Sequence, residues 1–528
     1  MSVIQINHLS FTYDGGLMPV FTDLTLRLDS AWRLGLVGRN GRGKTTLMRL
    51  LKGELQGTGQ IISAVDFDLF PFHLDLSRDA QSALIDSLAP YTTWEAEMAN
   101  CLAASTPEAL NQYGDIQARY MAENGYAIRS LLAKEAALLG LEPEALGRPL
   151  ATFSPGERVR LMMAALFLRK NRFLLIDEPT NHLDMAGRER MAQYLSGKSG
   201  FLVASHDRSF LDIACNHILA LEKEGARVVN GNYSTYRENK QRQDDHERAE
   251  NERIQKDIRR LRASARETAN WSDKIEATKI GHGVGDRGFV GAQSARMMKR
   301  SLAIQGRIER QAQEQESLLK NLEYTAPITL PVLQHKSQVL LRLEKAGFSY
   351  EKRPLFENLD LVVKPGDRLA ITGPNGAGKT TLLKVLKGDL TPTAGSAWRP
   401  QRLVISWLPQ TSQHLTGTPR EIAARRGLDL TRLLTMLRKF DLPREHFDQD
   451  SAGFSLGQKK KLLLAMSLSQ PAHLYLWDEP LNDIDPESRE QIEDMLLSTE
   501  AALVFIEHER AFVEKVASQI LPIAPPCI

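Results

Sequence analysis

Short runs of apolar residues that end at a glycine or at acidic residues recur along the chain. RLGLVG at 33–38 and RLAITG at 368–373 each lead into a glycine-rich loop, while FLLIDEP at 173–179 and LYLWDEP at 474–480 each end in two carboxylates. Runs of this length are typical of strands that are buried in a parallel sheet. Helical patterns follow both glycine-rich loops. We therefore expect an α/β fold in which the strand ends carry the chemistry.

Two other regions have the composition of helices. Residues from about 80 to 146 are rich in Ala, Leu, Glu and Gln with few strand formers, which predicts a helical arm. Residues 238–268 contain almost no helix breakers and few apolar side chains, which predicts a long exposed helix. A glycine-rich stretch and a second helical run, about 292–322, follow it. Helix, loop and helix together predict an antiparallel hairpin.

Four motifs occur twice in the same order, so the chain contains an internal repeat. GRNGRGKTTLMRLLKGEL at 38–55 returns as GPNGAGKTTLLKVLKGDL at 373–390, and FSPGERVRLMMAALFL at 153–168 returns as FSLGQKKKLLLAMSLS at 454–469. The strands that end in carboxylates, and FLVASHD with LVFIEHE further on, complete the set. The expected domains are residues 1–236 with the arm at about 80–146, a linker at 237–336, and residues 337–528.

Composition excludes several classes of protein. Of the 528 residues, 42% are hydrophobic and 25% are charged, which excludes wholesale disorder. No apolar stretch reaches the roughly 18 residues that a membrane span needs, and the N-terminus lacks the layout of a signal peptide. Three scattered cysteines suit a reducing compartment. We expect a cytoplasmic protein without a membrane-spanning segment.

Both glycine-rich loops fit the phosphate-binding pattern G-x-x-x-x-G-K-T. The glycines let backbone N–H groups point at a triphosphate, and the helix that follows adds its positive end. Lys44 and Lys379 would bridge the β- and γ-phosphates, and Thr45 and Thr380 would ligate Mg²⁺. ATP and Mg²⁺ are the expected cofactors.

The acidic pairs that end the two buried strands supply the remaining chemistry. Asp177 and Asp478 would hold Mg²⁺, directly or through water, while Glu178 and Glu479 would orient and deprotonate the attacking water. A strand-terminal acid that only caps a turn is the alternative. The other predicted catalytic residues are His206 and His508. Each follows an apolar strand in the same place in both copies, so γ-phosphate sensing is favoured over a core histidine.

SPGE at 154–157 and SLGQ at 455–458 lie between the loop and the carboxylate pair in both copies. Alone, each is merely a good helix N-cap. In this position each resembles the signature of ABC ATPases, a degenerate LSGGQ, and the resemblance covers both halves. It implies that the halves pair head to tail around two ATP molecules, each touching the loop of one half and the signature of the other. Tyr13 and Tyr350 lie where ABC domains stack adenine, although each suits an ordinary strand aromatic as well.

The resemblance also identifies a Q-loop glutamine, Gln410, as a ligand of Mg²⁺ in the second copy. The predicted ATP-binding residues are Tyr13, Gly38, Arg39, Asn40, Gly41, Arg42, Gly43, Lys44, Thr45, Thr46, Ser154, Gly156, Glu157, Tyr350, Gly373, Pro374, Asn375, Gly376, Ala377, Gly378, Lys379, Thr380, Thr381, Gln410, Ser455, Gly457 and Gln458. The predicted Mg²⁺ ligands are Thr45, Asp177, Thr380, Gln410 and Asp478.

The order ABC domain, charged linker, ABC domain resembles the ABC-F family of ribosome-associated ATPases. GNYSTYRENK at 231–240 resembles the passage by which those proteins leave the first domain, and the linker resembles their P-site tRNA-interaction motif. FPF at 70–72, FVGAQSARMMKRS at 289–301 and LYLWDEPLNDID at 474–485 are similar to the antibiotic-resistance branch. That branch protects ribosomes from lincosamides, pleuromutilins and streptogramin A. The resemblance implies a monomer that binds the ribosomal E site, with large-subunit rRNA and P-site tRNA as partners.

The charge of the linker independently favours a nucleic-acid partner. Residues 237–336 carry 20 Lys and Arg against 15 Asp and Glu, and residues 287–308 carry five basic residues and no acidic one. A basic helix beside a glycine-rich loop suits phosphate backbones, although a solvated helix face would look the same. The predicted RNA-binding residues are Arg287, Arg296, Lys299, Arg300 and Arg307.

The two copies also differ where their motifs should match. Phe72 stands where the second copy has Gln410, and a phenylalanine cannot ligate Mg²⁺ or orient water. Arg39 and Arg42 replace Pro374 and Ala377 of the second loop, adding positive charge beside the phosphates. Pro155 removes a backbone donor from the first signature. These departures predict two unequal ATPase sites.

Three other functions fit parts of the sequence. A housekeeping ABC-F factor that relieves stalled ribosomes is an alternative to drug protection within the ribosome-associated family. The ATPase subunit of a transporter with separate membrane subunits would leave the charged linker without a role. A DNA-repair ATPase of the SMC or UvrA kind would have much longer coiled coils or zinc-binding cysteines.

Overall fold

The computed structural model describes residues 2–15, 18–222, 225–277, 328–350, 353–412 and 415–524, together with a few residues between 299 and 310. It divides into two compact units. The first unit combines Met1–Ser234 with Ala326–Ile528, here called the first half and the second half, and the second unit is Thr235–Thr325.

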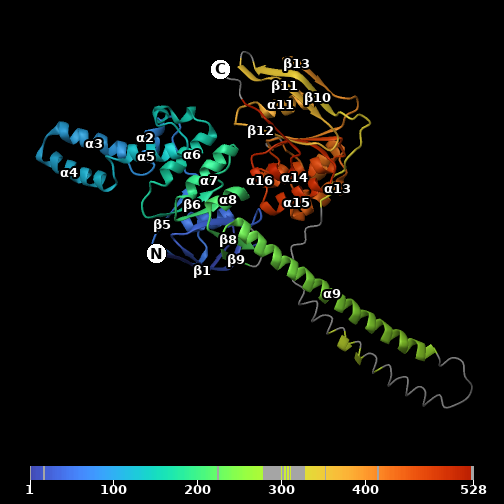
Figure 1. Ribbon diagram of the computed structural model, residues 1–528. Helices are drawn as coiled ribbons and strands as arrows, with labels where there is room; N and C mark the ends of the chain where they lie inside the picture. Colours follow the sequence, from blue (N-terminus) through green and yellow to red (C-terminus); the bar gives the residue numbers. More distant parts are fainter. Residues whose placement is uncertain are drawn as a thin grey trace, which may run out of the picture. The chain divides into compact units, whose positions relative to one another are not determined.

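The first half is built on two sheets (Figure 1). A six-stranded sheet has the order β5-β6-β7-β3-β8-β9, and a three-stranded antiparallel sheet has the order β2-β1-β4. The neighbours from β5 to β8 run parallel, and their apolar runs are buried on both faces as expected. The strands are β1 (Val3–Phe11), β2 (Phe21–Asp29), β3 (Arg33–Val37), β4 (Thr58–Ile62), β5 (Asp66–Phe70), β6 (Arg172–Asp177), β7 (Phe201–Ala204), β8 (His217–Glu222) and β9 (Gly225–Asn230).

The helices of the first half follow the strands and form the predicted arm. The helices beside the sheets are α1 (Lys44–Lys52), α6 (Pro155–Leu166), α7 (Met185–Ser196) and α8 (Arg208–Ala214). The arm consists of α2 (Ala80–Asp86), α3 (Tyr91–Ala104), α4 (Pro107–Ala122) and α5 (Ile128–Leu138), followed by the 3₁₀ turns η1 (Pro143–Gly147) and η2 (Leu150–Thr152). Asp79 and Thr106 cap α2 and α4, because their side chains accept a hydrogen bond from a backbone N–H of the first turn.

The second half repeats this architecture without the long arm. Its sheets have the orders β14-β15-β16-β12-β17 and β11-β10-β13. The strands are β10 (Leu341–Tyr350), β11 (Arg353–Val363), β12 (Arg368–Thr372), β13 (Ala394–Trp398), β14 (Ile405–Leu408), β15 (Leu474–Asp478), β16 (Ala502–Ile506) and β17 (Gln519–Pro522). The helices and 3₁₀ turns are α11 (Lys379–Lys387), α12 (Pro419–Arg426), α13 (Leu430–Lys439), η3 (Arg444–Asp448), η4 (Ser451–Gly453), α14 (Leu456–Ser469), α15 (Pro486–Leu497) and α16 (Arg510–Val516).

The second unit contains nearly all of α9 (Tyr233–Ala277), a helix of 45 residues whose charged side chains form pairs such as Arg242 with Glu238. The predicted long helix is therefore present. The glycine-rich stretch and most of the second helical run lie outside the described residues. Among the helices that the structure describes, none combines the length and the apolar character that crossing a bilayer requires.

Candidate functional site

The two glycine-rich loops join a parallel strand to a helix in each half. The first connects β3 to α1 and the second connects β12 to α11, so residues from Gly38 to Thr46 and from Gly373 to Thr381 fill the loops and the first helical turns. Gly43 and Gly378 have φ angles of 86° and 89°, where a residue with a Cβ would be strained. Each directly precedes its helix. The free backbone N–H groups of that turn can therefore bind phosphate oxygens.

The two loop lysines have matching environments. Lys44 and Lys379 each donate from Nζ to the carbonyl oxygen of the first glycine of their own loop, at 2.7 Å in both cases. Burial lowers the pKa of both ammonium groups, and nearby carboxylates oppose that shift. The carboxylates that oppose the shift include Asp485 of the second half, which raises the pKa of Lys44, and Asp184 of the first half, which raises the pKa of Lys379. Each lysine therefore lies close to an acidic residue of the opposite half.

The aspartates that end β6 and β15 fit a metal ion. Thr45 Oγ1 donates to Asp177 Oδ2 at 2.7 Å, which brings two oxygen ligands together in the first half. Both carboxylate oxygens of Asp478 are buried, and burial raises the pKa of this carboxyl to about 6 although the Thr380 hydroxyl opposes the shift. Thr380 is the second residue of α11, in the place that Thr45 has in α1. Oxygen donors of this kind suit Mg²⁺, and an ion would satisfy the buried oxygens of Asp478.

The glutamates that follow these aspartates have the same unusual backbone. Glu178 and Glu479 both have a φ of 48°, in the left-handed region that residues with a side chain seldom adopt. Such strain often accompanies function because it fixes the direction of a side chain. Burial, together with the neighbouring Asp177 carboxylate, raises the pKa of Glu178 to about 8.

Glu479 has a different environment. Gln410 donates from Nε2 to Glu479 Oε1 at 2.8 Å, and Asn482 donates from Nδ2 to Oε2. Burial alone would raise the pKa of Glu479, but His508 and Gln410 outweigh it and lower the pKa to about 2. The carboxyl groups of Glu178 and Glu479 are therefore expected to differ in charge at neutral pH.

The two histidines stand beside the glutamates. His206 Nε2 lies 3.4 Å from Glu178 Oε1, and His508 Nε2 lies 3.5 Å from Glu479 Oε1. Burial and the charge of Lys44 hold the pKa of His206 well below its usual value. A neutral His206 imidazole can donate one hydrogen bond toward a γ-phosphate.

Phe72 takes no part in this arrangement. The Arg169 guanidinium lies over its ring, 4.8 Å from the centroid, as in a cation–π contact. Gln410 instead points at Glu479. The glutamine of the second half therefore contacts the glutamate of that half, while the phenylalanine of the first half packs against an arginine instead.

The two signatures begin helices, and the second signature approaches the first half. Ser154 and Ser455 cap α6 and α14 through reciprocal hydrogen bonds with Glu157 and Gln458. A Cβ on Gly457 would lie 2.9 Å both from Asn40 Nδ2 of the first half and from the Asp483 carbonyl oxygen, so a side chain there would disturb the contact between the halves. A Cβ on the corresponding Gly156 would lie 2.7 Å from the His182 carbonyl oxygen.

Each glycine-rich loop also bonds to a loop of the opposite half. Asn40 Nδ2 donates to the Asp483 carbonyl oxygen at 2.6 Å, and Asn375 Nδ2 donates to the His182 carbonyl oxygen at 2.9 Å. We call the region of the first loop, Glu178 and the second signature the first composite site. The region of the second loop, Glu479 and the first signature is the second composite site.

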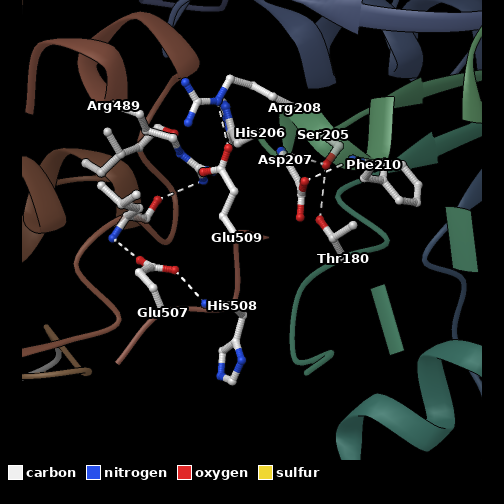
Figure 2. Close-up of polar contacts among 12 residues, drawn as sticks. Thr180, Ser205, His206, Asp207, Arg208, Phe210, Arg489, Glu507, His508 and Glu509 are labelled. Carbon is white, nitrogen blue, oxygen red and sulfur yellow. Dashed lines mark hydrogen bonds and ion pairs between the residues drawn. The ribbon is translucent and has the colours of Figure 1, made fainter. Parts of the chain in front are cut away.

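A buried ionic network joins the halves beside the two histidines (Figure 2). Arg208 of the first half donates from Nε to Glu509 Oε1 at 2.7 Å and also binds Glu493. Arg489 donates to the second oxygen of Glu509 at 2.7 Å. Both glutamates are fully buried, and the network connects the residues that follow His206 and His508 in the sequence.

The predicted aromatic residues are half-exposed in both halves. Tyr13 follows β1 and forms a hydrogen bond with Thr46 Oγ1 at 2.8 Å. Tyr350 ends β10, where its ring packs edge-on against Phe348. Their exposed fractions of 45% and 51% leave a ring face available for an adenine.

Few of the basic linker residues are described. Lys299 and Arg307 are helical and exposed. Arg287, Arg296 and Arg300 lie outside the described residues.

Several residues at the interface of the halves were not predicted. His182 and Asp483 offer the carbonyl oxygens to the glycine-rich loops, and Arg208 with Glu493 carries the ionic network. The repeat of TNHLD as LNDID after the carboxylate pair was a usable signal for the first two residues. Arg208 recurs as Arg510, but Glu493 had no such signal, because Ala192 stands in the first half where Glu493 stands in the second.

The comparisons with known proteins agree with this geometry. The sequence pattern of the ABC transporter family matches residues 21–181 and 356–482, more than half of the chain. The chain therefore belongs to the ABC transporter family, and it is an ATPase with two ABC domains.

Similar proteins extend over nearly the whole chain. YdiF of Bacillus subtilis, described as an ATP-binding protein, is 27% identical over 99% of this chain and 80% of its own length. The ABC transporter F family member 5 of Arabidopsis thaliana is 26% identical over 100% of this chain and 76% of its own. The ribosome protection protein VmlR of Bacillus subtilis is 26% identical over 99% of this chain and 87% of its own. The chain is thus similar to ABC-F type ATP-binding proteins.

A solved structure supports the fold. The complex of the archaeal ribosomal stalk protein aP1 with the archaeal ribosome recycling factor aABCE1 matches with a TM-score of 0.59, at 19% identity, over 98% of this chain and 87% of the matched chain. The prediction of two P-loop ABC domains in tandem is confirmed.

Proposed function

We propose that this protein is an ABC-F factor that binds the ribosome when ATP holds its two halves together. The observation that carries the proposal is the interlocking of the halves, in which each glycine-rich loop bonds to the opposite half next to a signature. A triphosphate in each composite site would bridge the halves and stabilise this arrangement. The ATP and Mg²⁺ ligands would be the residues that the motifs predict.

In each site the protein residues would divide the work of hydrolysis. Thr45 with Asp177, and Thr380 with Asp478, would hold Mg²⁺, which would neutralise phosphate charge. Glu479 would accept a proton from the attacking water, and Gln410 would orient it. Glu178 would do the same in the first composite site once its carboxyl is deprotonated.

The linker would carry the action on the ribosome. We propose that it extends from the E site toward the P-site tRNA and the peptidyl-transferase centre, and that basic residues between 287 and 308 contact RNA phosphates. Differential affinity of the ribosome for the closed state would make ATP a switch. The similarity to a ribosome protection protein favours ribosome protection over a housekeeping role. The drugs that we propose are lincosamides, pleuromutilins and streptogramin A. The protein would act in the cytoplasm as a monomer.

Ribosome co-sedimentation of the Glu178→Gln/Glu479→Gln double variant tests the proposal. We expect pelleting with 70S particles in ATP and little pelleting without nucleotide. Absence of pelleting, in a variant shown to bind ATP, would contradict the ribosome assignment. Resistance assays with the three drug classes then separate drug protection from relief of stalled translation.

A further inference from the structure

The first glycine-rich loop carries an arginine that reaches the opposite half. Arg39 donates from Nε to Glu487, and its Nη1 lies 3.3 Å from Asp441 Oδ2. The arginine side chain is 12% exposed, against 28% for Glu487 and 56% for Asp441. Glu487 lies in the first turn of α15, where the helix dipole favours a carboxylate. The charge of Arg39 is therefore directed at the second half.

The internal repeat shows what stands in the equivalent places of the second composite site. Arg39 corresponds to Pro374 in the aligned loops. Glu487 follows the helix-capping Asp485 by two residues, as Ala186 follows Asp184. By the same alignment Gly140 corresponds to Asp441, and both have a positive φ, of 72° and 57°. The three charged residues of this contact thus have uncharged counterparts in the second site.

The neutral contacts across the two sites do not differ in this way. Asn40 and Asn375 stand at equivalent loop positions, and each donates to a carbonyl oxygen of the opposite half. Each loop therefore makes a neutral hydrogen bond to the opposite half, and the first loop adds an ionic contact.

We propose that Arg39 is a positioning residue that clamps the first glycine-rich loop to the second half through Glu487 and Asp441. Its backbone lies beside the ATP lysine, because Lys44 Nζ donates to the carbonyl oxygen of Gly38, one residue before Arg39. The clamp holds the loop in its phosphate-binding shape when the halves close. It makes closure tighter at the first composite site than at the second.

Steady-state ATPase kinetics of the purified full-length chain test this assignment without ribosomes. The Glu479→Gln background isolates the first composite site, and the Glu178→Gln background isolates the second. In the first background, Arg39→Ala and Glu487→Gln should each raise the KM for ATP about tenfold, the effect expected from removing one partner of a partly buried charge pair. The kcat should change less than about twofold, because the chemical groups are untouched. High salt should raise the KM of the parent more than that of either variant.

The double variant Arg39→Ala/Glu487→Gln separates the clamp from a direct action of Arg39 on phosphate. If the residues act as a pair, its KM should be no higher than that of either single variant. Arg420→Ala is the matched control, because Arg420 forms an exposed pair with Asp448 inside the second half, and it should leave KM unchanged. An unchanged KM in Glu487→Gln, or additive effects in the double variant, would overturn the clamp. An equal rise in KM at the second site would contradict the proposal that the clamp acts only at the first site.

Discussion

The two composite sites contain the same motif residues in different electrostatic surroundings. In the second site Gln410 and His508 keep the Glu479 carboxyl ionised, with a pKa of about 2. In the first site Phe72 packs under Arg169 instead, and the pKa of Glu178 rises to about 8. The first site carries the additional ionic contact of Arg39. The comparison indicates that the first site is suited to holding the halves together and the second site to hydrolysis at neutral pH.

The largest expected effect concerns the buried network that joins the halves. Arg208→Ala should destabilise the protein by about 2 kcal/mol, because it removes the arginine that Glu493 and Glu509 face across the interface. This value is at the low end of the range for breaking a buried charge pair, because Lys515 still pairs with Glu493 and Arg489 still pairs with Glu509. Differential scanning calorimetry should show a fall of about 4–8 °C in the Tm of the transition that includes the interface.

Arg510→Ala is the matched control for this variant. Arg510 is the counterpart of Arg208, but it pairs with Glu514 of its own helix at an exposed position. Its loss should leave the Tm nearly unchanged. Equal falls in Tm in the two variants would show that Arg208 contributes no more to stability than the exposed Arg510.

Single replacements of the two glutamates should lower hydrolysis unequally. Near pH 7 we expect Glu479→Gln to lower the overall rate about tenfold, because Glu178 is mostly protonated and only the deprotonated carboxylate can accept a proton. Glu178→Gln should lower it less than about twofold. Phosphate release measured for the two variants under the same conditions tests this prediction. Equal losses of activity would contradict the prediction that the two sites are unequal.

The pH dependence of the isolated sites follows from the same pKa shifts. The first site, measured in Glu479→Gln, should gain about tenfold in kcat between pH 7 and pH 9, because a carboxyl with a pKa of about 8 ionises over that interval. The second site, measured in Glu178→Gln, should be flat over this range because Glu479 is already ionised. Parallel profiles would show that the two glutamates share one environment.

Much of this architecture follows from local sequence, and the differences between the sites do not. The glycine-rich loops, the carboxylates at strand ends and the helix-capping serines of the signatures could be predicted, because each depends on residues adjacent in the chain. The pairs that make the sites unequal join distant residues: Arg39 and Glu487 are 448 positions apart, and Arg208 and Glu493 are 285 apart. Nothing in either local sequence marks its partner. The sequence places Phe72 opposite Gln410, but only the packing reveals how strongly the two glutamates differ.

The smallest expected effect would make the first site more like the second. Phe72→Gln, in the Glu479→Gln background, gives the first site an amide at the sequence position that Gln410 holds in the second, where Gln410 donates to Glu479. A hydrogen bond to the carboxylate favours its charged form, so the pKa of Glu178 should fall. We expect kcat at pH 7 to rise about threefold, with the midpoint of the pH profile moved to lower pH. Phe72→Leu, which removes the aromatic ring without adding a donor, should leave the midpoint unchanged. A rise in kcat with an unmoved midpoint would mean that the glutamine acts on the attacking water alone, and that the pKa of Glu178 does not limit the first site.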